Sequence, residues 1–454
     1  MGQKGTLHPS AHAGIDASGD HPSGYAGSDA SGGKLAIEEL IHMALVDNPD
    51  IAMARDRLRI ARESLELTDS LFRPHITFYT EFMTGDAPSS YLFKTIDQRL
   101  LPSHLNFNDP GMFNNIESGL TLGMNIYKGG SDSASVRIAE SDIREKKAMT
   151  HEMENRITAS VIELFFSVLK AEEYIDITRQ SAETLQEQLR VMEVRFRGGG
   201  VLKSDILSLE VRLADARKDI AQARNIHAKT LTALKGLLGK YPDSSMELDG
   251  SCECPIVFPG SYQEAVVIAM EKRPEMSMAR EKVQKARLEL NRAGAGYLPR
   301  IDIKGKWYLD SDNLKFNGGS NNYTAAIIMN WDIYTGQSTE SEITIAGHAL
   351  NMAVKNMKKT ELTIYEDVKR AYLNHEDALN RLGVAARSVD MANESLALVQ
   401  KRYEGGSESV TRYLEAELAR SRSRMNRTAA FYDEKIALSH IAVSMGILSQ
   451  AWKK

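Results

Sequence analysis

The chain has 454 residues, of which 42% are hydrophobic and 26% charged, and its formal net charge is -5. This composition is typical of a folded or long-helix protein and excludes a chain that is disordered throughout. Acidic and basic residues are interspersed, so the sequence lacks the concentrated basic surface of nucleic-acid-binding proteins, and we expect no nucleic-acid partner.

The N-terminal segment differs in composition from the rest of the chain. Residues 1–33 are rich in Gly, Ser, Ala, His and Asp and show no hydrophobic periodicity, which predicts a disordered polar tail. The segment also lacks the apolar stretch of a signal peptide, so a signal peptide is not visible in this chain.

From residue 34 on, the sequence reads as two related halves, 34–250 and 251–454. Each half begins with a helical pattern that contains an early proline, and a second proline opens a segment of alternating polarity. Matching positions recur in the same order: Pro49 with Pro274, Pro74 with Pro299, Phe196 with Tyr403, and Gly199 with Gly406. We therefore predict a tandem repeat of one structural unit, with a longer loop between the strands of the first copy.

The predicted elements follow the same order in both halves. The first half should contain a helix, a strand over 72–82, a loop over 83–115, a strand over 116–127, a long helix over 128–197, a turn and a helix over 200–240. The second half should contain a helix over 261–297, strands over 298–309 and 322–333, a long helix over 335–404, a turn and a helix over 407–450. A helix of about 70 residues is a rod of roughly 105 Å, so two shorter helices stacked end to end could pair with each long one.

The four predicted strands alternate apolar and polar side chains. No stretch reaches the run of about 18 apolar residues of a membrane-spanning helix, so a bilayer could be crossed only by strands. Alternation with aromatic residues towards the strand ends is typical of a membrane β-barrel. The aromatic candidates are Phe78, Phe82, Trp307, Tyr323 and Trp331. A half-buried sheet in a soluble protein has the same alternation. The long helices favour the barrel, and closure then requires several chains, because open edges are not tolerated in lipid.

Glycine-rich segments separate each long helix from the helix that follows it. Glycine permits the positive φ angles that end one helix and reverse the chain into the next. The candidate contact residues of the two turns are Gly198, Gly199, Gly200, Val201, Gly405, Gly406 and Ser407.

The sequence carries no motif that predicts an enzyme. We find no nucleophile elbow, phosphate-binding loop, zinc-binding histidine pair or dinucleotide fingerprint in a context that supports it. We therefore expect no catalytic residue, cofactor or metal. The two cysteines, Cys252 and Cys254, lack a nearby histidine and fall short of a tetrahedral metal site. We interpret them as a linker pair, free or oxidised. Methionines along the helices fit gap-filling, with methionine-lined metal export as the alternative.

Residues 35 to 450 resemble the TolC family of outer-membrane efflux proteins. The resemblance rests on the tandem repeat, on the helix starts Asn48-Pro49 and Arg273-Pro274, on Leu298-Pro299 before a strand, and on the Tyr-x-Gly-Gly run at Tyr127. It also rests on the paired turns RFRGGGVLKSDILSLE and RYEGGSESVTRYLEAE. No single motif is specific, whereas their order, spacing and duplication together are.

The resemblance implies a mainly α protein with a membrane β-barrel. In such a homotrimer, four strands per protomer close a twelve-stranded barrel in outer-membrane lipid, and the helices form an α-helical barrel across the periplasm. The helix turns then form the periplasmic tip, which docks onto an adaptor (membrane fusion) protein linked to an inner-membrane pump. The implied function is the exit duct of a tripartite efflux or type I secretion system. The rival interpretation is a soluble coiled-coil scaffold with no transport role.

The resemblance also implies gate residues at the tip. In the family, a Tyr and an Arg of the second turn reach an Asp after the first turn; Tyr403 and Asp205 match, but Glu408 stands where the family has Arg. Two acidic residues that ring the family's tip correspond here to Arg412 and Glu415. They could attract across protomers as an alternating ring, or be two solvated charges on a helix face. For the loop over 83–115 we favour partial occlusion of the barrel mouth over ligand binding.

Overall fold

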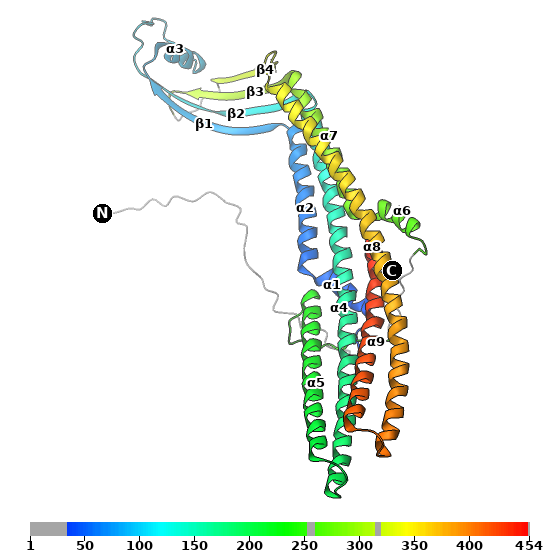
Figure 1. Ribbon diagram of the computed structural model, residues 1–454. Coiled ribbons are helices and arrows are strands. Elements are labelled where there is room, and N and C mark those ends of the chain that lie inside the picture. The colour runs from blue at the N-terminus through cyan, green and yellow to red at the C-terminus, as the bar shows by residue number, and fades with distance from the viewer. Residues whose placement is uncertain (1–33, 252–258, 314–318, 453–454) are drawn as a thin grey trace, which may run out of the picture.

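The computed structural model describes residues 34–251, 259–313 and 319–452 (Figure 1). The predicted tail over 1–33 and the pair Cys252 and Cys254 lie outside the described residues. The described chain is elongated, with a sheet at one end and the turns between long helices at the other. The site residues are therefore distributed between two distant ends.

The first half supplies helices around two strands. Its elements are α1 (Ile37–Asp47), α2 (Pro49–Asp69), the 3-10 turn η1 (Ser70–Phe72), β1 (His75–Gly85), α3 (Pro88–Asp97), β2 (Phe113–Lys128), α4 (Ser131–Arg197) and α5 (Lys203–Leu237).

In the described residues the second half repeats this order, except that it has no counterpart of α3 and ends with the additional helix α10. Its elements are α6 (Tyr262–Lys272), α7 (Pro274–Gly294), η2 (Ala295–Tyr297), β3 (Arg300–Ser311), β4 (Asn321–Asn330), α8 (Ser338–Glu404), α9 (Val410–Met445) and the short α10 (Leu448–Ala451). The long helices α4 and α8 each have 67 residues, which corresponds to rods of about 100 Å.

Prolines and a glycine interrupt helices that we expected to be continuous. The helix expected over 261–297 is broken at Arg273, because a residue before proline is pushed into the extended region; Arg273 has φ -65° and ψ 126°. Asn48 precedes Pro49 and is likewise extended, so it separates α1 from α2. Its side chain caps α2 by accepting from the Asp50 amide at 2.9 Å. The helix expected over 407–450 stops at Gly446, which has a positive φ of 73°.

The segment expected as a loop over 83–115 contains a helix and the ends of two strands. Strand β1 runs on to Gly85, β2 begins already at Phe113, and α3 lies between them with Pro88 in its first turn. At the other strand ends, β1 begins at His75 because Ser70–Phe72 form a 3-10 turn, and β3 runs from Arg300 to Ser311. The remaining helix ends differ from expectation by a few residues.

Strand β4 is shorter than predicted. It ends at Asn330, which pairs with Arg300, the first residue of β3. Pro299 precedes Arg300 and has no amide hydrogen to donate, so the ladder stops there. Trp331 consequently lies beyond the strand that was expected to carry it.

The long helices form two antiparallel hairpins, α4–α5 and α8–α9, and the shorter helices α2 and α7 pack beside them. Helices α2 and α5 lie one above the other along α4, while α7 and α9 both pack along α8 (Figure 1). The expectation that two shorter helices pair with one long helix is met in both halves. Helix α7 also contacts α4, and α9 contacts α4, so the two hairpins form one body.

The sheet is antiparallel in the order β1-β2-β3-β4. Directly opposed residues point to the same side of a sheet. The register opposes Phe78 to Leu120, Leu120 to Trp307, and Trp307 to Tyr323, so one apolar row crosses all four strands. Strands β1 and β4 are the two open edges. The predicted apolar sides of the strands therefore lie on one face.

Two apolar clusters matter for the sites below. The waist cluster packs α1 against the middle of α4, with contributions from Ile37, Leu40 and Phe165. The tip cluster lies next to the turns and joins α4, α5, α8 and α9. Its buried members are Ala182, Leu185, Met192, Leu209, Leu213, Ala216, Leu396, Tyr403, Val410, Tyr413 and Ala416.

Candidate functional site

The two turns at the tip have the same backbone design. Gly199 and Gly406 adopt positive φ angles of 77° and 74°. The following residues close the same hydrogen bond, from the Gly200 amide to the Arg195 carbonyl and from the Ser407 amide to the Arg402 carbonyl, each at 2.9 Å. This is a Schellman-type helix end, in which glycine tolerates a conformation that strains other residues.

The other glycines of the turns do not use that freedom. Gly198 and Gly405 end their helices with φ angles of -86° and -79°, and Gly200 also lies outside the positive-φ set. The expected positive φ therefore occurs at one glycine per turn. Val201 packs against the tip cluster, whereas Ser407 is exposed.

Tyr403 is anchored inside the tip cluster. Its side chain is 9% exposed, its ring stacks on Tyr413 at 5.3 Å between centroids, and its hydroxyl donates to Met192 Sδ at 2.6 Å. Burial raises the pKa of Tyr403, the positive charge of Arg195 opposes this, and the negative charge of Asp205 adds to it. Asp205 thus lies close enough to act on Tyr403 as a charge.

The expected hydrogen bond between Tyr403 and Asp205 is not made in the single chain described. Stacking on Tyr413 draws the ring into the apolar cluster, and the hydroxyl finds the sulfur of Met192 there. Glu408 is partly exposed and accepts from the Ser409 amide at 3.2 Å. The three residues are neighbours at the tip without forming a hydrogen-bonded latch within one protomer.

Arg412 and Glu415 form an ion pair within α9. Their charged groups are 3.2 Å apart, and both side chains are more than half exposed. Such exposed pairs one helical turn apart add little stability. In the single chain the two charges therefore neutralise each other on their own helix face.

A buried carboxylate at the tip was missed by sequence reasoning. Glu417 on α9 is 1% exposed and accepts from Arg420 Nη2 at 3.0 Å and from Ser181 Oγ of α4 at 3.2 Å. The only sequence signal was the one-turn spacing of Glu417 and Arg420, which is equally common on solvated helix faces.

At the opposite end of the molecule, the predicted barrel aromatics are exposed on the apolar face of the sheet. Phe78 and Tyr323 are 69% and 80% exposed, and Phe82 and Trp307 are exposed on the same face. Trp331, beyond β4, donates from Nε1 to the Tyr297 carbonyl at 3.1 Å. It therefore ties the end of the sheet to the helices and does not extend the apolar row.

Helix α3 lies on the polar face of the sheet. Its Lys94 forms ion pairs with Glu117 of β2 and Asp310 of β3, and Lys306 of β3 also contacts Glu117 at 2.7 Å. Gln98 adds a hydrogen bond to Asn115 Oδ1 at 2.7 Å. These partners were not foreseen, because the ion pairs join residues that are far apart in the sequence.

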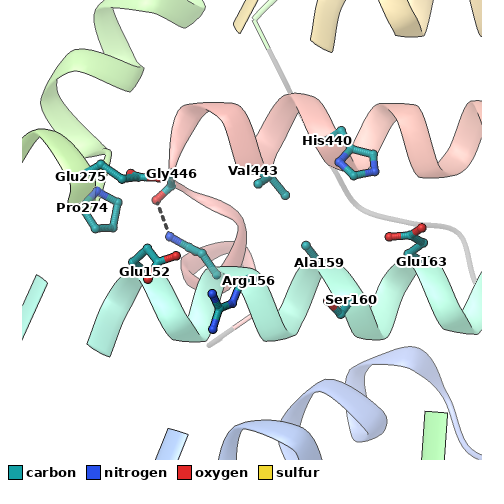
Figure 2. A pocket seen from close by; sticks show the side chains of 11 residues that line it. Glu152, Arg156, Ala159, Ser160, Glu163, Pro274, Glu275, His440, Val443 and Gly446 are labelled. Atoms are coloured by element: carbon teal, nitrogen blue, oxygen red, sulfur yellow. Dashed lines mark hydrogen bonds between the residues drawn. The ribbon is translucent and has the colours of Figure 1, made fainter. Parts of the chain in front are cut away.

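The waist contains an open cavity of about 300 Å³ between α4, the start of α7 and the end of α9. Figure 2 shows Glu163 of α4 and His440 of α9 projecting towards the space between their helices. Asn155 Nδ2 closes one end by donating to the Gly446 carbonyl at 3.3 Å. Throughout the described ranges, no three His, Cys, Asp or Glu side chains gather as a metal site.

None of the helices in the described part of the chain combines the length and the apolar character needed to cross a membrane.

Comparison with known proteins identifies the family. The model of the outer membrane efflux protein family matches residues 40–240 and 265–446. The outer membrane protein TolC of Vibrio cholerae is 21% identical over 341 residues, which cover 74% of this chain and 77% of that protein. The CusC crystal structure superposes with a TM-score of 0.79 at 17% identity, covering 90% of this chain and 91% of that one. The Campylobacter jejuni CmeC outer membrane channel gives a TM-score of 0.78 at 17% identity, covering 91% and 86%. The chain therefore belongs to the outer membrane efflux protein family, with the mainly helical fold and four-stranded antiparallel sheet of TolC-like channels.

Proposed function

We propose that the chain is one protomer of a homotrimeric outer-membrane exit duct, which passes cargo received from an inner-membrane pump. The observation that carries this proposal is the open four-stranded sheet, whose apolar face is exposed and whose strands continue into helices of about 100 Å. A face of this kind is stable in lipid, and rods of this length can reach across an aqueous compartment.

The open edges support closure by further copies. Neighbouring strands alternate in direction from β1 to β4, so β4 of one copy runs antiparallel to β1 of the next and can continue the same pattern. Unpaired amide and carbonyl groups in lipid cost several kcal/mol each. Three copies would close a barrel of twelve strands without a free edge.

The helices support the same assembly. Exposed apolar residues follow α8 at spacings close to whole helical turns: Ile345, Met352, Leu362, Leu373, Val384, Met391 and Leu398. A second exposed apolar stripe runs along α2, which packs beside the α4–α5 hairpin. Its members are Met53, Ile60 and Leu67. Contiguous exposed apolar surface marks an interaction site. The α8 stripe of one protomer would therefore pack against the α2 and α5 edge of the next.

The two ends of the duct would have different tasks. Helix α3, held on the polar face of the sheet by Lys94, would partly occlude the barrel mouth. The turns Gly198–Val201 and Gly405–Ser407, exposed for most of their length, would meet a periplasmic adaptor protein. The opening of the tip would be controlled by Asp205, Tyr403 and Glu408. In the trimer, Arg412 could form its ion pair with Glu415 of a neighbouring protomer, which would give a ring of alternating charges.

A membrane extraction and a conductance measurement test the function. The native protein should require detergent for extraction and should form ion-conducting pores in a planar lipid bilayer. A soluble coiled-coil scaffold, the rival function, would stay in aqueous buffer and leave the bilayer non-conducting.

A further inference from the structure

The two hairpins at the tip meet around one buried carboxylate. Glu417 of α9 has a side chain that is 1% exposed and is flanked by Ser181 of α4 and by Arg420 of its own helix. Arg212 of α5 is near enough for its positive charge to act on Glu417. Glu417 of the α8–α9 hairpin thus interacts with both helices of the α4–α5 hairpin. It forms a hydrogen bond with α4 and an electrostatic interaction with α5.

This cluster is only half satisfied. Among the described residues, Glu417 Oε2, Arg212 Nε and Arg420 Nε are buried without a hydrogen-bond partner. A buried charge with incomplete partners contributes little net stability and is sensitive to any change in its charge. The contact of Glu417 between the hairpins should therefore change in strength with the charge of Glu417. Another contact between α9 and α4 near this level is a hydrogen bond from Arg424 Nη1 to Gln180 Oε1 at 2.8 Å, and it does not involve a carboxylate.

We propose that Glu417 is the proton-sensitive latch of the tip, and that its protonation sets how firmly the α8–α9 hairpin is held against α4–α5. This inference rests on the proposed function, in which the tip is the inner end of a channel. Widening a ring of hairpins at their turns requires neighbouring hairpins to separate. Separation at this level would expose Glu417 to water.

The direction of the effect follows from burial. Burial raises the pKa of Glu417, although Arg420, Ser181 and Arg212 each act to lower it. When the hairpins separate, the carboxyl regains water and its ordinary pKa. The packed arrangement therefore binds the proton more tightly, and its extra stability is present below the ordinary pKa of glutamate. That stability is lost as pH rises through the raised pKa, so a rising pH loosens the tip.

The charges that act most strongly on Glu417 are both positive. The charged groups facing it are Arg212 from α5 and Arg420 from α9, while α4 supplies the neutral Ser181. From α8, Tyr403 stacks on Tyr413, a residue on which the charge of Glu417 acts. The charge of Glu404, also from α8, acts on Tyr413 as well. Glu417 is therefore the group whose titration should dominate at this level.

Single-channel recording over a pH series tests the latch with two variants and one control. Glu417→Gln imitates the protonated form and should give a low open fraction that no longer changes with pH. Ser181→Ala removes a hydrogen bond that favours the charged carboxylate, so the pH midpoint of opening should move upward. Glu210→Gln is the matched control, because Glu210 occupies the corresponding place in α5 and is exposed.

Wild-type protein and the control should show an open fraction that rises severalfold with pH. Conducting pores whose open fraction does not depend on pH, or a Glu417→Gln variant that keeps the wild-type pH dependence, would overturn the latch and leave the channel function intact. A wild-type protein that never conducts would instead reject the proposed function, and the latch with it. Particle mass and circular dichroism of each variant establish that it is folded.

Discussion

Lys94 should control the docking of α3 on the sheet. Its side chain is 19% exposed, and its partners Glu117 and Asp310 are 4% and 0% exposed, so Lys94→Met leaves two carboxylates buried with one cation fewer. Breaking a buried ion pair costs about 3 to 5 kcal/mol. The lower end applies here, since Glu117 keeps Lys306 and Asp310 keeps the amide of Asn115 at 2.8 Å.

A loss of about 3 kcal/mol lowers the ratio of docked to undocked α3 by about a hundredfold. Methionine retains the apolar stem of lysine, so the change isolates the charge. Limited proteolysis of the detergent-solubilised protein should then cut within the α3 segment much faster than in wild type. Channel conductance should rise as well if α3 narrows the lumen.

Lys304→Met is the matched control, because Lys304 is an exposed lysine of β3 on the same polar face, without an ion pair to α3. It should leave the cleavage rate of the α3 segment unchanged. If Lys94→Met and Lys304→Met gave the same cleavage rate and conductance as wild type, the role assigned to Lys94 would be refuted.

Five further substitutions test three other parts of the structure. Tyr413→Ala removes a fully buried ring from the tip cluster and should cost about 3 to 5 kcal/mol, seen as a lower thermal midpoint, while Tyr403→Phe should cost less than about 1.5 kcal/mol because it deletes one hydrogen bond. Gly406→Ala forces a side chain into positive φ and should destabilise the turn by about 1 kcal/mol, whereas Gly405→Ala should be tolerated. Trp307→Arg places a charge on the apolar face and should cost about 2 to 4 kcal/mol near the membrane midplane, measured as reduced assembly into the outer membrane.

Features set by local sequence could be predicted well. The long helices α4 and α8 lack proline and end at glycines, so their C-terminal ends at Arg197 and Glu404 agree with expectation. The strand faces followed from alternation alone, and the register then placed Phe78, Trp307 and Tyr323 in one row. Periodicity and turn chemistry act over a few residues, which is why the sequence discloses them.

Features that depend on distant partners could not be predicted. Helix α3 is short and is held by Lys94 against residues of β2 and β3, so no local pattern indicated its docking. The burial of Glu417 comes from α4 and α5, and the hydroxyl of Tyr403 was drawn to Met192 by packing that the turn sequence does not encode. Motif alignment placed Tyr403 at the tip but did not give its contacts.

The mass of the detergent-solubilised particle tests the central claim most directly. An open four-stranded sheet with two free edges requires partners in lipid, and three copies would close it. Native mass measurement, corrected for bound detergent, should therefore give three times the 50.4 kDa mass of the chain. A stable particle with the mass of a single chain would contradict the account.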